Sequence, residues 1–159
     1  MILNRVDSLT ISTRINRTLN MNYKIDFIGG GNMADSLIGG LLANYYSDNM
    51  LTVAEPDNDK LAQLNQKCSI NTTTDNSLAI TSSDIVVLAV KPQILQQVCR
   101  DIADAIQIKK PLIISIAAGI RSTDIDRWLG NDCALVRCMP NTASLRSEEH
   151  TSELQSLRH

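Results

Sequence analysis

A glycine-rich loop decides the fold of this chain: Phe27-Ile28-Gly29-Gly30-Gly31-Asn32-Met33-Ala34. Residues 23–28, which lead into the glycines, are mostly apolar and predict a strand. The residues after the loop predict a helix over 35–46, because apolar side chains recur there at helical spacing. The loop therefore joins the end of a strand to the start of a helix.

Each small residue of the loop has a physical purpose. Gly29 allows a tight strand-to-helix turn, Gly31 lets the backbone approach a pyrophosphate, and Ala34 lets the helix pack close to its strand. Free N–H groups at the start of a helix, together with its positive dipole end, bind anions. The motif predicts a dinucleotide phosphate site. A tight turn without a ligand is the alternative, and the strand–loop–helix context favours the first interpretation.

The rest of the chain alternates strand-like and helical stretches. Segment 85–90 is apolar on both faces, which is typical of a parallel strand covered by helices. The pattern predicts an α/β fold with a doubly wound, mostly parallel sheet. Strands are expected over 51–54, 69–72, 85–90, 112–116 and 134–137, and helices over 57–67, 76–81, 94–106 and 122–129.

Composition narrows the function classes. With 15 basic and 17 acidic residues among 159, the net charge of -2 offers no basic surface for nucleic acid. No apolar run is long enough to span a membrane, so we expect a soluble, cytoplasmic chain with one domain. The only histidines are His150 and His159, so the body of the chain has none for acid–base chemistry or metal binding, and we expect no metal.

The four cysteines lie in or beside apolar segments and form no CxxC pair, which predicts reduced core thiols. A metal or redox pair of Cys133 and Cys138 is the less favoured alternative.

The two ends differ in composition from the body. Residues 1–20 are rich in Arg, Ser and Thr, which indicates either a transit peptide or, as we favour, a non-native or disordered extension read from an early start codon before Met21. Residues 146–156 back-translate to a common sequencing adapter, so we interpret 146–159 as a non-native tail after Leu145; a genuine amphipathic helix is the alternative. The predicted nucleotide-binding domain is 21–145.

Four motifs resemble those of the pyrroline-5-carboxylate reductase family in order and spacing. They are the loop at 27–34, Leu88-Ala-Val-Lys-Pro-Gln93, Ser115-Ile-Ala-Ala-Gly119 and Val136-Arg-Cys-Met-Pro-Asn-Thr142. The resemblance covers 21–145. It implies a Rossmann-like NAD(P)-binding domain and the reduction of 1-pyrroline-5-carboxylate to L-proline, the last step of proline biosynthesis.

The resemblance also implies roles for individual residues. The loop residues would surround the pyrophosphate, Asn76 would approach the adenosine end, and the residues after the later strands would line the nicotinamide and the imine substrate. The implied cofactor-binding residues are Ile28, Gly29, Gly30, Gly31, Asn32, Met33, Asn76, Ala89, Val90, Lys91, Pro92, Ile116, Ala117 and Ala118, and the substrate-proximal residues are Met139, Pro140 and Asn141.

Two features depart from the family. Ala143 stands where the family usually has proline. In the family a helical C-terminal domain forms the dimer and holds the substrate acid, and we expect this domain to be absent here. We therefore expect a cofactor-binding fragment that is not competent alone, with a homo-oligomer only for a full-length protein. The alternatives are another imine or deazaflavin oxidoreductase, a binding module without turnover, or no stable fold.

The resemblance implies NADPH or NADH as the cofactor. Glu55 follows the second predicted strand, where an acidic side chain can bind the ribose 2′-hydroxyl and repel a 2′-phosphate, which favours NADH. A solvent-facing residue before Pro56 is the alternative, Lys60 is near, and the family widely uses NADPH, so the choice stays open. Reducing a protonated C=N bond needs a positioned hydride donor more than a protein acid, and the catalytic residue is unknown.

Overall fold

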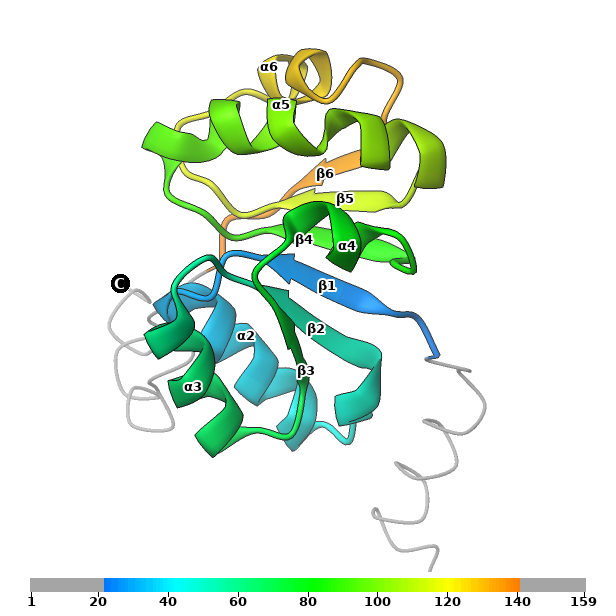
Figure 1. The fold of residues 1–159 in the computed structure, drawn as a ribbon. Helices are drawn as coiled ribbons and strands as arrows, with labels where there is room; N and C mark the ends of the chain where they lie inside the picture. The colour runs from blue at the N-terminus through cyan, green and yellow to red at the C-terminus, as the bar shows by residue number, and fades with distance from the viewer. Residues whose placement is uncertain (1–21, 141–159) are drawn as a thin grey trace, which may run out of the picture.

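A computed structural model of the chain describes residues 22–140, which form one six-stranded parallel sheet between two layers of helices (Figure 1). The strand order is β3-β2-β1-β4-β5-β6, which confirms the predicted doubly wound α/β fold. The strands are β1 (Ile25–Ile28), β2 (Leu51–Ala54), β3 (Asn71–Thr73), β4 (Ile85–Leu88), β5 (Leu112–Ser115) and β6 (Leu135–Arg137).

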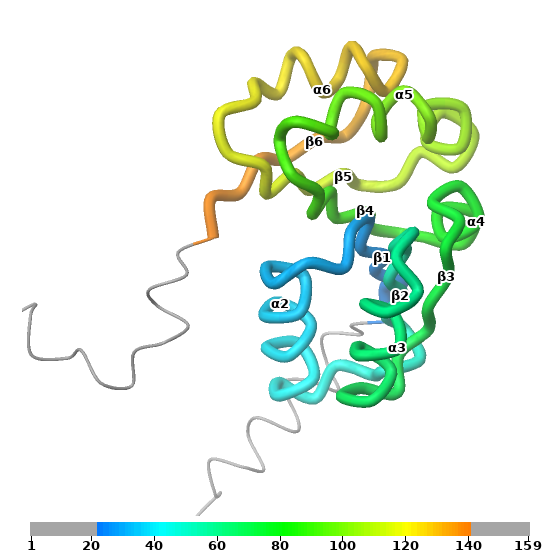
Figure 2. The backbone as a smooth tube through the Cα atoms, turned by 60° about the vertical axis from the view of Figure 1, so that its left-hand side comes forward, coloured from blue at the N-terminus to red at the C-terminus, as the bar shows by residue number. Residues whose placement is uncertain are grey.

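The helices divide between the two faces of the sheet, as the two views show (Figures 1 and 2). One face carries α2 (Asn32–Ala43) and α3 (Asn58–Lys67). The other carries α4 (Asn76–Ile80), α5 (Pro92–Lys109) and α6 (Ser122–Trp128). A short 3-10 helix, η1 (Asp48–Met50), precedes β2 and was not predicted.

Two apolar clusters hold these layers together. Because successive side chains of a strand point to opposite faces, Phe27 of β1 packs with α2 and α3, whereas Ile28 packs with α5 and α6. Both side chains are fully buried, as are Ile38 of α2 and Leu95 of α5. β1 and β4, the two central strands, each contribute side chains to both halves of the core.

The register aligns the carboxyl ends of the strands. Ile28 pairs with Ala54 on one side and with Leu88 on the other, and Leu88 pairs with Ser115. The chain therefore leaves β1, β2, β4 and β5 at the same level. The residues that follow each strand meet along one edge, where ligands bind in such sheets.

The helix starts differ in how they are capped. Asp57 caps α3 by accepting hydrogen bonds from two backbone N–H groups, and Asp75 caps α4 in the same way. The N-caps of α2 and α5 are Gly31 and Lys91, and neither makes a side-chain cap. The free N–H groups of these two helices lie beside the carboxyl ends of the strands.

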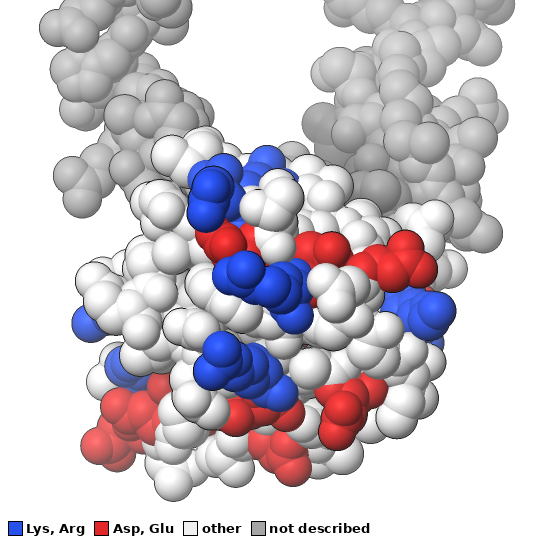
Figure 3. Space-filling model, turned by 90° about the horizontal axis from the view of Figure 1, so that it is seen from above, with Lys and Arg blue, Asp and Glu red and all other residues white. Residues whose placement is uncertain are grey.

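Acidic and basic side chains alternate on the outer face that α5 and α6 form (Figure 3). Asp124 accepts hydrogen bonds from both Arg121 and Arg127, each at 3.1 Å. No described helix is both long enough and apolar enough to cross a membrane. The proposed extension at 1–20 and the tail at 146–159 lie outside the described residues, and the 21–145 boundary stays a prediction.

Candidate functional site

The glycine loop lies where the strand order changes direction, between β1 and β4. The helix after β1 covers one face, and the helix after β4 covers the other, so a crevice opens between the two connections. Both of these helices have the uncapped starts described above. The site therefore brings together the turn after β1 and the turn after β4.

Gly29 makes the tight turn that its sequence predicts. Its φ is +104°, and a Cβ added there would lie 2.7 Å from the carbonyl oxygen of Ala89. Its N–H donates to the carbonyl of Ala54 at 2.8 Å, while the Ala89 N–H donates to the carbonyl of Ile28 at 2.9 Å. The loop is thus held between the ends of β2 and β4.

Gly31 leaves open space at the start of α2. No heavy atom lies within 4 Å of a Cβ built on Gly31, and its φ of -77° is ordinary for any residue. The fold itself therefore does not require glycine there. Asn32, the first residue of α2, is exposed, and Ala34 is fully buried against the sheet. An open, uncapped helix start of this kind suits a phosphate.

Glu55 is buried, and its side chain turns toward the glycine loop. Its Oε2 accepts a hydrogen bond from the Gly30 N–H at 2.9 Å, and its Oε1 accepts one from the Asp57 N–H at 3.2 Å. The residue is only 7% exposed. The alternative that Glu55 is merely a solvent-facing residue is wrong.

A polar hollow of about 160 Å³ adjoins the loop between α2 and α3. Lys67 and Asp35 both line it and form an ion pair of 2.8 Å, and this carboxylate raises the pKa of the Lys67 ammonium. Lys60 lines the same hollow, with its Nζ 3.9 Å from the Glu55 carboxylate. Two ammonium groups and two carboxylates, of which that of Glu55 is buried, therefore lie beside the loop.

Asn76, the first residue of α4, has an unusual side chain. Its Oδ1 is buried without a hydrogen-bond partner, and no other buried side-chain nitrogen or oxygen of residues 22–140 lacks one. Buried polar atoms are normally paired, so an unpaired one points to a missing ligand group. This atom fits the predicted approach of Asn76 to the adenosine end of a cofactor.

The residues after β4 form the opposite wall of the crevice. The backbone of Ala89 contacts Gly29. The side chain of Val90 also lies close to Gly29, because a Cβ added to Gly29 would be 3.0 Å from the Val90 Cγ1. Lys91 is exposed at the start of α5, and Pro92 occupies the first turn, where its missing N–H costs nothing.

The residues after β5 and β6 meet at an apolar groove of about 480 Å³ on the α2 side of the sheet. Ile116, Met139 and Pro140 line it together, while their roles beside a nicotinamide and a substrate stay predictions. Ala117 instead packs into the core on the other face, and Ala118 is exposed. Asn141 lies outside the described residues.

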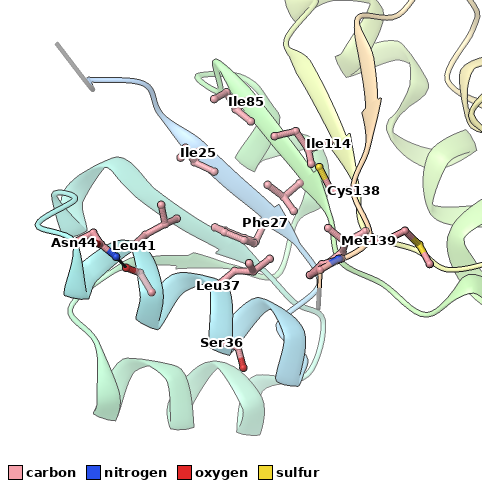
Figure 4. A pocket seen from close by; sticks show the side chains of 14 residues that line it. Ile25, Phe27, Ser36, Leu37, Leu41, Asn44, Ile85, Ile114, Cys138 and Met139 are labelled. Carbon is pink, nitrogen blue, oxygen red and sulfur yellow. Dashed lines mark hydrogen bonds between the residues drawn. The ribbon is translucent and has the colours of Figure 1, made fainter. Parts of the chain in front are cut away.

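Other residues that line the groove were not predicted from the sequence to be functional. Leu37 and Leu41 of α2 form one wall, and Ile114 and Cys138 lie on the opposite side (Figure 4). The groove exists because no described helix covers β4 and β5 on this face. Apolar strand residues look alike whether covered or open, so no signal in the sequence marks this groove.

The cysteines differ in their surroundings, and the expectation of four core thiols is wrong in part. Cys99 is fully buried, and burial raises the pKa of its thiol to about 12, whereas Cys138 is exposed. All four thiols are free. Within residues 22–140, no three His, Cys, Asp or Glu side chains cluster in a way that could hold a metal ion.

Known proteins are similar to this chain in sequence and in fold. The pyrroline-5-carboxylate reductase of Vibrio alginolyticus is 45% identical over 121 residues, which are 76% of this chain and 44% of that protein. The structure of the Coxiella burnetii pyrroline-5-carboxylate reductase is 43% identical with a TM-score of 0.75, over 78% of this chain and 46% of that one. The chain thus spans about half the length of these relatives.

A third similar protein is the Plasmodium falciparum pyrroline carboxylate reductase, whose structure has NADP bound. It is 29% identical with a TM-score of 0.66, over 78% of this chain and 44% of that one. The family described as NADP oxidoreductase, coenzyme F420-dependent, matches residues 24–119, which are more than half of the chain and include the glycine loop. The chain therefore belongs to this NADP oxidoreductase family, and it resembles the pyrroline-5-carboxylate reductases.

Proposed function

We propose that this chain is the NAD(P)H-binding part of a pyrroline-5-carboxylate reductase. The observation that carries the proposal is the uncapped start of α2 at Gly31, next to a glycine turn at the point where the strand order reverses. The same edge holds the unpaired Oδ1 of Asn76. A dinucleotide would supply phosphates for the start of α2 and polar adenosine groups for Asn76.

Different described residues would bind different parts of the cofactor. The N–H groups at the start of α2 hold the pyrophosphate, and Asn76 binds toward the adenosine end. Ile116 lies beside the nicotinamide, with Met139 and Pro140 near the imine. When bound, a reduced nicotinamide supplies a hydride to the carbon of a protonated C=N bond, whose electron pair moves to nitrogen. In this proposal the chain's contribution is to position the donor.

Substrate binding also requires a partner for the substrate's carboxylate. The imine acid carries a carboxylate, yet none of the fourteen described residues lining the groove is charged. We therefore propose that groups outside residues 22–140 hold the carboxylate, and that cofactor binding, rather than turnover, is the property that these residues carry alone. The relatives' substrate, 1-pyrroline-5-carboxylate, is the small molecule we propose for the whole protein.

A cytoplasmic location is part of this proposal. Four free thiols, one of them exposed, suit a reducing compartment. Membership of a family named for coenzyme F420 makes a deazaflavin oxidoreductase the second candidate, but its match ends at Gly119, before the segment containing Met139 and Pro140. The pyrroline-5-carboxylate reductase of Vibrio alginolyticus matches a longer stretch of this chain, 121 residues, which favours the first candidate.

Titration calorimetry of the 159-residue chain with NADH and NADPH tests the proposal. We expect saturable binding of at least one cofactor, and Gly31→Ala should weaken it at least tenfold, because the new methyl group would occupy the space left for the phosphate. Gly39→Ala is the matched control: it lies in the same helix, also with no atom within 4 Å of its added Cβ. Equal binding by both variants would refute the phosphate site.

Activity is measured in the same preparation by adding 1-pyrroline-5-carboxylate and following the absorbance of the reduced cofactor. We expect binding without substrate-dependent oxidation. Oxidation that depends on the substrate would show instead that the chain already holds all the groups that turnover needs.

A further inference from the structure

The position of Glu55 bears on which cofactor the chain prefers. Glu55 directly follows β2 at the ligand-binding edge of the sheet. In this class of fold, an acidic side chain at that position accepts hydrogen bonds from the ribose 2′-hydroxyl, whereas enzymes that use the 2′-phosphorylated cofactor place a cation nearby.

The Glu55 carboxylate is fixed in place. Its Oε2 accepts a hydrogen bond from the Gly30 N–H at 2.9 Å, and its Oε1 accepts a hydrogen bond from the Asp57 N–H at 3.2 Å. The Cβ of Glu55 also packs closely against Gly30, because a Cβ added to Gly30 would lie 3.2 Å from the Cβ of Glu55. If Glu55 swung away to admit a phosphate, the Gly30 N–H would lose its acceptor in a partly buried place. A 2′-phosphate would therefore meet a negative charge that cannot easily move.

The nearby lysines do not cancel this charge. Lys67 is already paired with Asp35 at 2.8 Å. Lys60 is 3.9 Å from Glu55, but its side chain is 51% exposed, against 9% for Glu55. Solvent and salt screen an exposed ammonium on a flexible stem more than they screen a buried carboxylate. The fixed negative charge therefore determines the local preference.

We infer that Glu55 makes this chain select NADH over NADPH, although the family to which it belongs is described by NADP. The inference rests on the proposed cofactor-binding function and deepens it. The two N–H donors hold the carboxylate where it accepts a hydrogen bond from the 2′-hydroxyl and repels a 2′-phosphate. Glu55 is thus a specificity-determining residue, and it also positions the glycine loop.

Calorimetric titration of the full chain with each cofactor tests this selection. We expect NADPH to have a dissociation constant at least tenfold higher than that of NADH. Glu55→Gln removes the charge and keeps an oxygen for the Gly30 N–H, so the ratio of the two constants should fall at least fivefold, mainly through tighter binding of NADPH.

Asp57→Asn is the matched control. It removes one negative charge from the same loop, and asparagine caps a helix as well as aspartate does, so α3 should keep its cap. We expect this variant to keep the wild-type ratio. If both variants lowered the ratio equally, the selection would come from the general field of the loop, and the specific role of Glu55 would be refuted.

The remaining outcomes separate the two proposals. Tighter binding of NADPH than of NADH by the wild-type chain overturns the selection and leaves the cofactor function intact, whereas binding of neither overturns both. If Glu55→Gln does not fold, competition on the wild-type chain decides the matter. Adenosine 5′-monophosphate should then displace NADH at lower concentration than adenosine 2′,5′-bisphosphate does, and the reverse order refutes the inference.

Discussion

Gly29 and Ala89 touch across the boundary between β1 and β4, so closely that a Cβ on Gly29 would lie 2.7 Å from the Ala89 carbonyl oxygen. The contact joins the two turns that border the proposed cofactor crevice. Backbone atoms form it on both sides, so no side-chain rotation can relieve a clash there. The two turns can lie this close only because Gly29 has no side chain.

Gly29→Ala should therefore destabilise the fold strongly. The variant combines the clash with a φ of +104°, and we expect a loss of more than about 2 kcal/mol in the free energy of unfolding by urea. Gly119→Ala is the control, because its φ is +75° but its added Cβ meets nothing within 4 Å. Strain alone should lower its stability by about 1 kcal/mol. Equal losses in the two variants would contradict the role of the Ala89 contact.

Asp26 should make stability depend on pH. Burial raises the pKa of this carboxyl, against the lowering effect of hydrogen bonds from Ser83 and Thr52. The native state therefore favours the protonated form, and its contribution is complete below the ordinary value of 3.8 and lost as pH rises through the raised native pKa. Asp26→Asn should unfold at higher urea concentration than the wild type at neutral pH, with the difference shrinking in acid.

Asp104→Asn serves as the reference for this experiment, because Asp104 is an exposed carboxylate of α5. Its unfolding midpoint should follow that of the wild type across the same pH range. A pH profile for Asp26→Asn parallel to the wild type would show that Asp26 does not titrate differently in the native and unfolded states.

Lys110→Gly should stabilise the protein. Lys110 ends α5 with a φ of +52°, and its N–H donates to the Ile106 carbonyl at 2.7 Å. Glycine adopts this left-handed conformation without steric cost, so we expect a gain of about 0.5–1 kcal/mol. Lys109→Gly, inside the last helical turn, should instead cost about 1 kcal/mol. A thermal unfolding series distinguishes the opposite signs.

The thiols should differ in reactivity. Cys138 is exposed, whereas Cys99 is buried with a pKa of about 12, and the thiolate is the reactive form. An aromatic disulfide reagent near pH 8 should therefore label Cys138 first and leave Cys99 unlabelled until the chain unfolds. Cys138→Ser should remove the fast phase, and a fast phase that persists in this variant would contradict the assignment.

Strand and helix positions were largely predictable from sequence, because local patterns determine them. The predicted strand over 51–54 matches β2, whose apolar run is clearly bounded. The first helix begins three residues earlier than predicted, at Asn32, because Gly31 already acts as its N-cap. α5 extends to Lys109, beyond the predicted end at 106, since Lys110 adopts the left-handed conformation that ends it.

The side-chain arrangement of the candidate site was less predictable. The orientation of Glu55 depends on the Gly30 N–H, which lies 25 residues away along the chain. The division of Ile116 and Ala117 between opposite faces depends on how the chain turns after β5. Long-range hydrogen bonds and packing decide such details, and a local pattern does not encode them. The carboxyl-end location of the site was predictable because parallel strands share that edge.

The bond between Glu55 and Gly30 also bears on the kinetics of association. It links β2 to the glycine loop through protein atoms alone, so we expect the loop to have its shape before a cofactor arrives. Binding then requires little ordering of the backbone. We expect the observed association rate in stopped-flow fluorescence to rise linearly with cofactor concentration, with no plateau from a slow loop closure.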